Sequence, residues 1–259
     1  MERYNPQSIE KQAKKWPVFT YEEDIYADMR RRLEGGIGLR AYDWIFPEVK
    51  TEYFDKEIID EYGIDACRLS VISTCGNKNT DKNDYLKHLD STYNWLSRFY
   101  EAFTIESSRQ FDEKPWLNAI FQAYDHAVLR KKPNLAFALI CKAFKDCPPN
   151  KALTKNNLEL VLSAVYPFLP ILSRFLVEKF VVKLGTVNEI FEKSEKFVGV
   201  RFRIGEGGWH REIFDKVRYE EAPLVELLRI KWVNAAANKR QATLTSVEGG
   251  KQIVFFGQN

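Results

Sequence analysis

Apolar residues spaced three or four positions apart are the feature that most limits how this chain can fold. The spacing gives each segment one apolar face, as amphipathic helices have. It predicts four helices, over residues 85–103, 115–131, 133–147 and 154–183. Pro167 and Pro170 predict a bend in the last of them, because proline removes a backbone donor from a helix. The fold class is therefore expected to be mainly α, with the helices packed as an antiparallel bundle.

Shorter helices are predicted before residue 85. Gly63 separates an acidic turn that begins near Lys56 from a second turn that reaches Ser73, because glycine takes the positive φ that ends one helix and lets the next begin. Near the N-terminus, Ser8 is the expected N-cap of another short helix. Residues 21–33 predict a further helix, acidic at its start and basic at its end, as the helix dipole favours.

Beyond Gly185 the pattern changes from helical to extended. Val200, Phe202 and Ile204 alternate with Arg201 and other neighbours, as in a half-buried strand. The strands predicted in this part cover residues 198–204, 227–234, 241–246 and 252–256. The expected organisation is an N-terminal helix and connector over 1–48, the helical bundle over 49–184 and a small α+β domain over 185–259.

The composition provides a hydrophobic core and no membrane segment. The 259 residues are 45% hydrophobic and 29% charged, which suffices for one large domain or two small ones. No stretch approaches the roughly 18 apolar residues that a membrane span needs. Residues 1–16 are too charged for a signal peptide. We therefore expect a cytoplasmic protein that does not bind a membrane.

Neither the cysteines nor the histidines predict a reactive centre. The cysteines lack a Cys-x-x-Cys spacing, and the histidines lie far apart, so we expect free or buried thiols and neither a metal nor another cofactor. None of these residues has a sequence neighbour that would make a nucleophile and base pair. Asp65 is more simply the partner of Arg68 in a helix-local ion pair. The residues considered were Cys67, Cys75, Cys141, Cys147, Asp65, His88, His126 and His210.

The segment around Gly63 resembles the one that follows the signature loop in class I leucyl-tRNA synthetases. In that family an acidic helix leads into a Tyr-Gly-Ala-Asp-x-x-Arg-Leu pattern. The match is carried by Tyr62, Gly63, Asp65, Arg68 and Leu69, with Ile64 in place of the alanine. The resemblance implies that the bundle is of the anticodon-binding type.

Further segments resemble the same family and follow in the same order. Tyr4, Pro6 and the Ile9-Glu10 pair ahead of Trp16 are similar to the family's opening residues. The other similar segments are residues 94–99, like the Phe-Leu-Asn-Arg helix that opens the bundle, 166–170, like a Pro-Phe-x-Pro-His segment, and 228–244, like the C-terminal strand and its partner. The departures are Ser97 for asparagine, Ile171 for histidine, Arg174 and Phe175 for an acidic pair, and Ala235 and Ala236 for glycine and lysine.

The catalytic loops of the family have no counterpart in this chain. The family activates its amino acid with a His-Ile-Gly-His loop and a Lys-Met-Ser-Lys-Ser loop, which stabilise charge on the ATP phosphates. This chain has no pair of histidines near a glycine, and residues 50–54 offer one lysine beside an acidic residue. The resemblance covers both flanks of the catalytic and editing domains, with a connector near 19–48 between them. We therefore expect no aminoacylation by this chain alone, and no other enzymatic activity.

The retained parts are those that hold tRNA in the family, so the resemblance implies a tRNA partner, most simply a leucine tRNA. A single basic cluster is more often a solvated face, but several on one surface give roughly micromolar, salt-sensitive affinity for a polyanion. The residues expected to contact RNA are Lys14, Lys15, Arg68, Arg98, Arg130, Lys131, Lys132, Arg201, Arg203, Arg229, Lys231, Trp232, Lys239 and Arg240.

Two alternatives stay open at the level of the sequence. The chain could be a subunit acting in trans, which delivers tRNA or aminoacyl-tRNA to a partner enzyme; its aromatic content of 14% and the connector at 19–48 suit a protein contact surface. It could also be a scaffold for protein interactions that no longer binds RNA. Binding of leucine tRNA and co-purification of a partner would distinguish these hypotheses.

Overall fold

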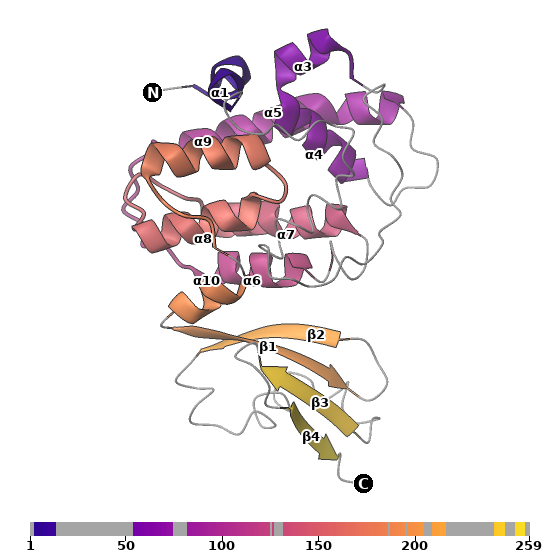
Figure 1. The fold of residues 1–259 in the computed structure, drawn as a ribbon, viewed down its shortest axis with the longest axis vertical. Coiled ribbons are helices and arrows are strands. Elements are labelled where there is room, and N and C mark those ends of the chain that lie inside the picture. The colour runs from indigo at the N-terminus through magenta and orange to yellow at the C-terminus, as the bar shows by residue number, and fades with distance from the viewer. Residues whose placement is uncertain are drawn as a thin grey trace. The chain divides into compact units, whose positions relative to one another are not determined.

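A computed structural model gives the architecture of the chain (Figure 1). It describes residues 3–13, 54–74, 82–124, 126, 132–185, 187–194, 196–204, 209–215, 241–246 and 252–256. These residues are mainly helical. The chain divides into two compact units, Met1–Val187 and Asn188–Asn259, called here the helical unit and the sheet unit. No helix within the described ranges combines the length and apolarity needed to cross a membrane.

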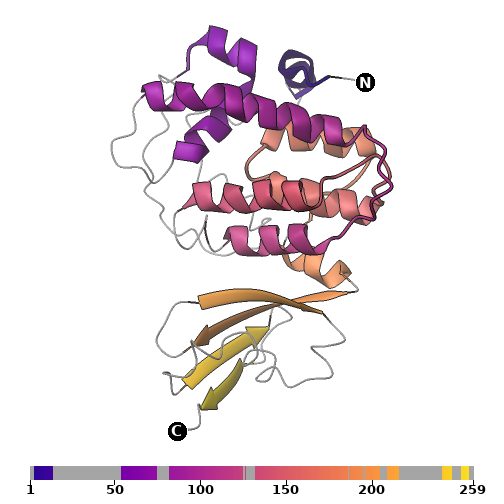
Figure 2. The ribbon, with the colours of Figure 1, turned by 180° about the vertical axis from the view of Figure 1, so that it is seen from behind.

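The helical unit contains most of the predicted helices. Its elements are α1 (Pro6–Ala13), α3 (Lys56–Tyr62), α4 (Ile64–Thr74), α5 (Lys82–Ala102), α6 (Lys114–Tyr124), α7 (Pro133–Asp146), α8 (Lys155–Val165) and α9 (Pro170–Phe180). Helix α4 packs against α5, α7 and α9, while α6 packs against α7 and α8. Figures 1 and 2 show α1 beside the ends of α3, α5 and α9, although α1 and α3 are separated in sequence. The prediction of helices over 85–103 and 133–147 is confirmed by α5 and α7.

Aromatic rings fill the centre of the helical unit. Phe99 and Trp116 are fully buried, and the ring of Trp95 is stacked on that of Phe99 at 5.2 Å. Trp95 also meets Phe137 and Phe144 of α7 edge to face, at 5.1 and 5.5 Å between ring centroids. Each such pair stabilises the fold by about 1 kcal/mol beyond the effect of burying the two rings. The apolar residues of α5, spaced three and four positions apart, therefore form one face that packs against the rest of the bundle, as expected.

The helix ends correct one capping prediction and confirm another. The N-cap of α1 is Asn5 and not Ser8, because the backbone N–H of Ser8 donates to Asn5 Oδ1 at 3.1 Å. Helix α3 is capped by Asp55, whose Oδ1 accepts from the Ile58 N–H at 3.1 Å. Gly63 has φ 83°, so it does separate α3 from α4 in the predicted way.

The single bent helix predicted over 154–183 is wrong, because two helices occupy this range. Helix α8 begins after Thr154, whose Oγ1 accepts from the Asn157 N–H at 3.3 Å, and it ends at Val165. Helix α9 starts at Pro170. Proline lacks a backbone N–H, and this costs nothing here because an N–H in the first turn of a helix has no partner within the helix. The prolines at 167 and 170 interrupt the backbone ladder fully instead of bending it.

The sheet unit is a four-stranded antiparallel sheet within the described residues. Helix α10 (Val187–Lys193) spans the boundary between the units, and the strands that follow are β1 (Phe197–Ile204), β2 (Trp209–Asp215), β3 (Gln241–Ser246) and β4 (Gln252–Phe256). Their order in the sheet is β2-β1-β3-β4. Three predicted strands are confirmed as β1, β3 and β4. Strand β2 was not predicted, because His210, Arg211 and Glu212 mask its alternation. The helix predicted over 21–33 and the strand over 227–234 lie outside the described residues.

Candidate nucleic-acid interface

Asp65 connects α4 to the first turn of α9. Its carboxylate is only 3% exposed and lies in the first turn of α4. Its Oδ1 accepts from the Ile171 N–H at 3.3 Å and its Oδ2 from the Leu172 N–H at 2.7 Å. These amides belong to the first turn of α9, whose N-cap residue Leu169 makes no side-chain cap hydrogen bond. Asp65 therefore caps a helix about a hundred residues away and places a negative charge at its positive end.

Arg68 lies one turn further along α4 and is also turned inward. It is 7% exposed, and its Nη2 donates to the carbonyl oxygen of Pro167 at 2.8 Å. That carbonyl belongs to the turn between α8 and α9, where the broken backbone ladder leaves acceptors to satisfy. Arg68 thus holds α4 against this turn. We leave it out of the interface proposed below, because a buried guanidinium cannot reach a phosphate.

Arg174, one of the departures from the family pattern, is engaged within its own region. Its Nε and Nη2 lie 3.3 and 3.1 Å from the Tyr166 hydroxyl, and both donate to it. Ile171, another departure, uses its backbone N–H for the bond to Asp65. These two positions therefore serve the join between α8 and α9.

Two expected RNA-contacting residues of the helical unit are exposed. Arg98 lies on α5, where its Nε donates to the Asn94 carbonyl at 3.3 Å, and Lys132 is the residue before α7. Arg98 also acts on the thiol of Cys141, whose pKa burial raises to about 12 against the opposing effect of the arginine. A thiol with this pKa is protonated at neutral pH and is no nucleophile.

The other two described cysteines are buried. Burial of Cys67 and Cys147 agrees with the prediction of buried thiols. Burial raises the pKa of Cys147, and its Sγ accepts from the Asp112 N–H at 3.2 Å. Among the described residues no three His, Cys, Asp or Glu side chains are gathered in a way that could hold a metal ion.

The strand register of the sheet unit brings basic residues together. Arg201 and Arg203 lie on β1, two positions apart and so on one face of the sheet. The register places Arg211 of β2 directly opposite Arg201, and Trp209 opposite Arg203. On the other side of β1, Thr245 and Thr243 pair with the same two arginines. We call these two rows, with the arginines at 201, 203 and 211 and the tryptophan at 209, the arginine face.

Arg211 and Trp209 were not predicted as site residues. Their strand was not predicted, so no register placed them opposite the arginines of β1. Like charges directly opposite each other destabilise an antiparallel pair. The register places Arg201 and Arg211 at such directly opposite positions.

The remaining predicted RNA contacts are not placed. Lys14, Lys15, Arg130, Lys131, Arg229, Lys231, Trp232, Lys239 and Arg240 lie outside the described residues. Comparison with known proteins gives no further guide, since no family model, no curated protein and no solved structure matches this chain.

Proposed function

We propose that this chain is a non-catalytic, cytoplasmic tRNA-binding protein that descends from a leucyl-tRNA synthetase by loss of the catalytic and editing domains. The observation that carries the binding part is the arginine face, where Arg201 and Arg211 are paired and Arg203 lies in the next row. Basic residues that neutralise phosphates contribute to polyanion binding by releasing counterions. The resemblance supplies the class of polyanion, because the retained segments are the tRNA-holding ones of that family.

The packing of the matched segments supports the proposed descent. Segments 62–69 and 166–170 each carry a family pattern, and they meet through the hydrogen bonds of Asp65 and Arg68. The helical unit that contains both segments is the part that we propose to hold a folded RNA by shape.

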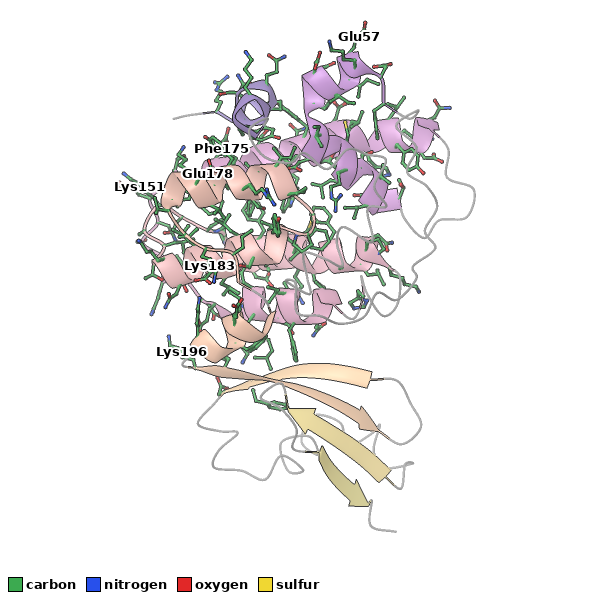
Figure 3. The ribbon with its side chains drawn as sticks, in the orientation of Figure 1. Glu57, Lys151, Phe175, Glu178, Lys183 and Lys196 are labelled. Atoms are coloured by element: carbon green, nitrogen blue, oxygen red, sulfur yellow. The ribbon has the colours of Figure 1, made fainter. Side chains whose placement is uncertain are left out.

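The position of α1 supports the loss of an intervening segment. Tyr4 is buried with its ring 5.6 Å from that of Tyr93 and 6.0 Å from that of Tyr100. The Tyr100 ring lies 6.3 Å from that of Phe175, which Figure 3 shows on α9. The Gln7 Nε2 donates to the Asp60 carbonyl at 3.2 Å, which ties α1 to α3. The two flanks of the connector therefore pack together directly, with no catalytic domain needed between them.

A gel-shift titration tests the proposal. The purified chain is expected to bind leucine tRNA more tightly than other tRNAs, with an affinity that falls steeply as salt rises. Changing Arg201, Arg203 and Arg211 together to Glu should weaken binding about 10-fold or more. In the matched control, three exposed lysines of the helical unit are changed to Glu instead: Lys114, Lys142 and Lys145. Equal or absent binding of all tRNAs at low salt would reject the proposal.

A second candidate function is a subunit that presents tRNA or aminoacyl-tRNA to a partner enzyme. It is favoured by Val181, which is 75% exposed and sits at φ 54° just after α9. A β-branched residue in this conformation is strained, and its exposure adds an apolar contact point. This candidate would be favoured if an enzyme co-purified with the chain and if Val181→Asp abolished that co-purification. A chain that elutes alone from cell extract would count against it.

A further inference from the structure

We infer that residues 3–13, which include α1 and are called here the strap, open and close over a binding slot while the rest of the helical unit stays folded. The strap lies where α3, α5 and α9 come together (Figures 1 and 2). When it is closed, the ring of Tyr4 occupies the slot; when it is open, a ligand with a flat ring and a negative charge can enter. The inference does not depend on RNA binding, because it rests on the contacts of the strap.

The strap is too short to be stable by itself. Its helix has eight residues, and isolated helices shorter than about 12 residues are marginal in water. Its polar side chains Asn5, Gln7 and Ser8 are exposed, and the capping hydrogen bond from the Ser8 N–H to Asn5 is made within the strap. The strap is therefore folded because of the surface against which it packs.

The strap is held less firmly than the central helices. Tyr4 and Ile9 anchor it, with 7% and 4% of their surfaces exposed. The hydrogen bond from Gln7 Nε2 to the Asp60 carbonyl is exposed, so water competes for it. Helix α8, in contrast, is buried at every position of Leu158–Val165. Elements with few buried apolar side chains open at the lowest free energy, so the strap should open while α8 stays closed.

The rings beneath the strap form a row that ends at an ammonium group. Tyr93 and Tyr100 are seven residues apart on α5, or about 10.5 Å along its axis. The Tyr4 ring lies between them, because its centroid is 5.6 Å from one ring and 6.0 Å from the other. Phe175 follows at 6.3 Å from Tyr100 (Figure 3), and Lys179 Nζ is 5.4 Å from the Tyr100 centroid and 5.8 Å from that of Phe175. We call the space that Tyr4 fills the ring slot.

The walls of the ring slot define the ligand. Aromatic rings pack favourably against another ring, edge to face or offset, and the Tyr4 ring shows that a group of this size is accommodated. The ammonium group of Lys179 attracts a phosphate, sulfonate or carboxylate on the same ligand. Because Tyr4 must leave first, the strap is an autoinhibitory contact, and the apparent affinity is lowered by the fraction of molecules that are closed.

Hydrogen exchange followed by mass spectrometry on the full chain tests the independent opening. The amides of residues 9–13 should exchange about 10-fold faster than those of α8, or more, in the parent chain. Tyr4→Ala should raise the rate in the strap about 10-fold further without changing that of α8, because truncating a buried ring weakens the closed state alone. Tyr4→Phe keeps the ring and is the matched control, with a smaller effect.

The exchange experiment can reject the strap without any variant. If residues 9–13 and α8 of the parent exchanged at the same rate, the strap would open only when the whole unit unfolds. The same conclusion would follow if Tyr4→Ala raised both rates equally or changed neither. Tyr4→Ala is expected to keep the helix content of the parent by circular dichroism, since α8 and its neighbours do not depend on the strap.

Binding of 1-anilinonaphthalene-8-sulfonate, followed by its fluorescence, tests the ring slot. This dye carries flat rings and a sulfonate, and Tyr4→Ala should bind it about 10-fold more tightly than the parent, because the slot is then empty. Adding Lys179→Gln to Tyr4→Ala should weaken dye binding again. Adding Lys142→Gln, at an exposed lysine of α7, is the control and should not. Equal dye binding by the parent and Tyr4→Ala, or equal effects of the two lysine changes, would overturn the ring slot.

Discussion

The two units use charged residues in opposite ways. In the helical unit, Asp65 and Arg68 are buried and their hydrogen bonds tie α4 to α9 and to the turn before it. In the sheet unit, the register sets Arg201 and Arg211 at directly opposite positions of β1 and β2, an arrangement that opposes strand pairing unless another charge offsets it. A charged residue in a matched sequence pattern is therefore not evidence of ligand contact. Its position in the fold decides whether it supports the structure or is available for binding.

The largest expected effect is on the buried side of this comparison. Asp65→Ala removes the acceptor of two α9 amides and one charge of a buried polar cluster, so we expect a loss of about 3 kcal/mol in the free energy of unfolding. Urea denaturation followed by circular dichroism measures it. Asp60→Ala, at an exposed position of α3, is the control and should change stability by less than about 0.5 kcal/mol. If both changes lowered the free energy of unfolding equally, the buried Asp65 would contribute no more to stability than an exposed aspartate.

The next prediction concerns the strained end of α9. The N–H of Val182 bonds to the Val177 carbonyl at 3.1 Å and that of Val181 to Glu178 at 3.3 Å, a helix end that glycine favours at position 181. Val181→Gly should therefore raise the free energy of unfolding by about 1 kcal/mol. Val182→Gly lacks the positive φ and should lower it. A destabilised Val181→Gly would mean that the exposed side chain packs against something in the folded chain.

Removing a charged side chain from the sheet unit should change the free energy of unfolding in the opposite direction to its removal from the helical unit. Arg211→Thr removes the like-charge pair with Arg201 and introduces a residue that favours strands, so stability should rise by about 0.5 kcal/mol. RNA affinity should fall in the same variant. Arg211→Lys keeps the repulsion and should change stability less. If Arg211→Thr lowered both stability and affinity, the arginine would be a structural residue like Arg68, and the contrast between the units would disappear.

The sequence predicted the elements better than it predicted the roles of their charged residues. Spacing at three and four positions identified α5 and α7, because a buried face imposes that period on a helix. Period-two alternation identified β1 but not β2, where charges occupy both faces. The inward position of Arg68 could not be predicted, because its partner Pro167 is distant in sequence and the turn that exposes this carbonyl exists only in the folded chain. Arg211 was missed for a related reason, since only the register places it opposite Arg201.

The smallest expected effect concerns the pH dependence of an exposed contact in the helical unit. The Tyr62 hydroxyl donates to Asp90 Oδ1 at 2.8 Å, and this hydrogen bond, followed by burial and the carboxylate charge, raises the pKa of Tyr62 from 10.0 to about 12. The folded state therefore retains the phenol proton more strongly than the unfolded state. The stabilisation is fully present below pH 10 and is lost as the pH rises to about 12.

Tyr62→Phe tests that pH dependence directly. The variant should be slightly less stable than the parent at pH 8, and the difference should shrink as the pH approaches 12, because the parent then loses the same hydrogen bond. Urea midpoints measured at pH 8, 10 and 11 for both chains give the comparison. Asp90→Asn provides the matched control, since it removes the charge while an acceptor oxygen stays. A difference between the chains that is constant with pH would show that the hydroxyl of Tyr62 contributes by packing alone, without the polar contact that links α3 to α5.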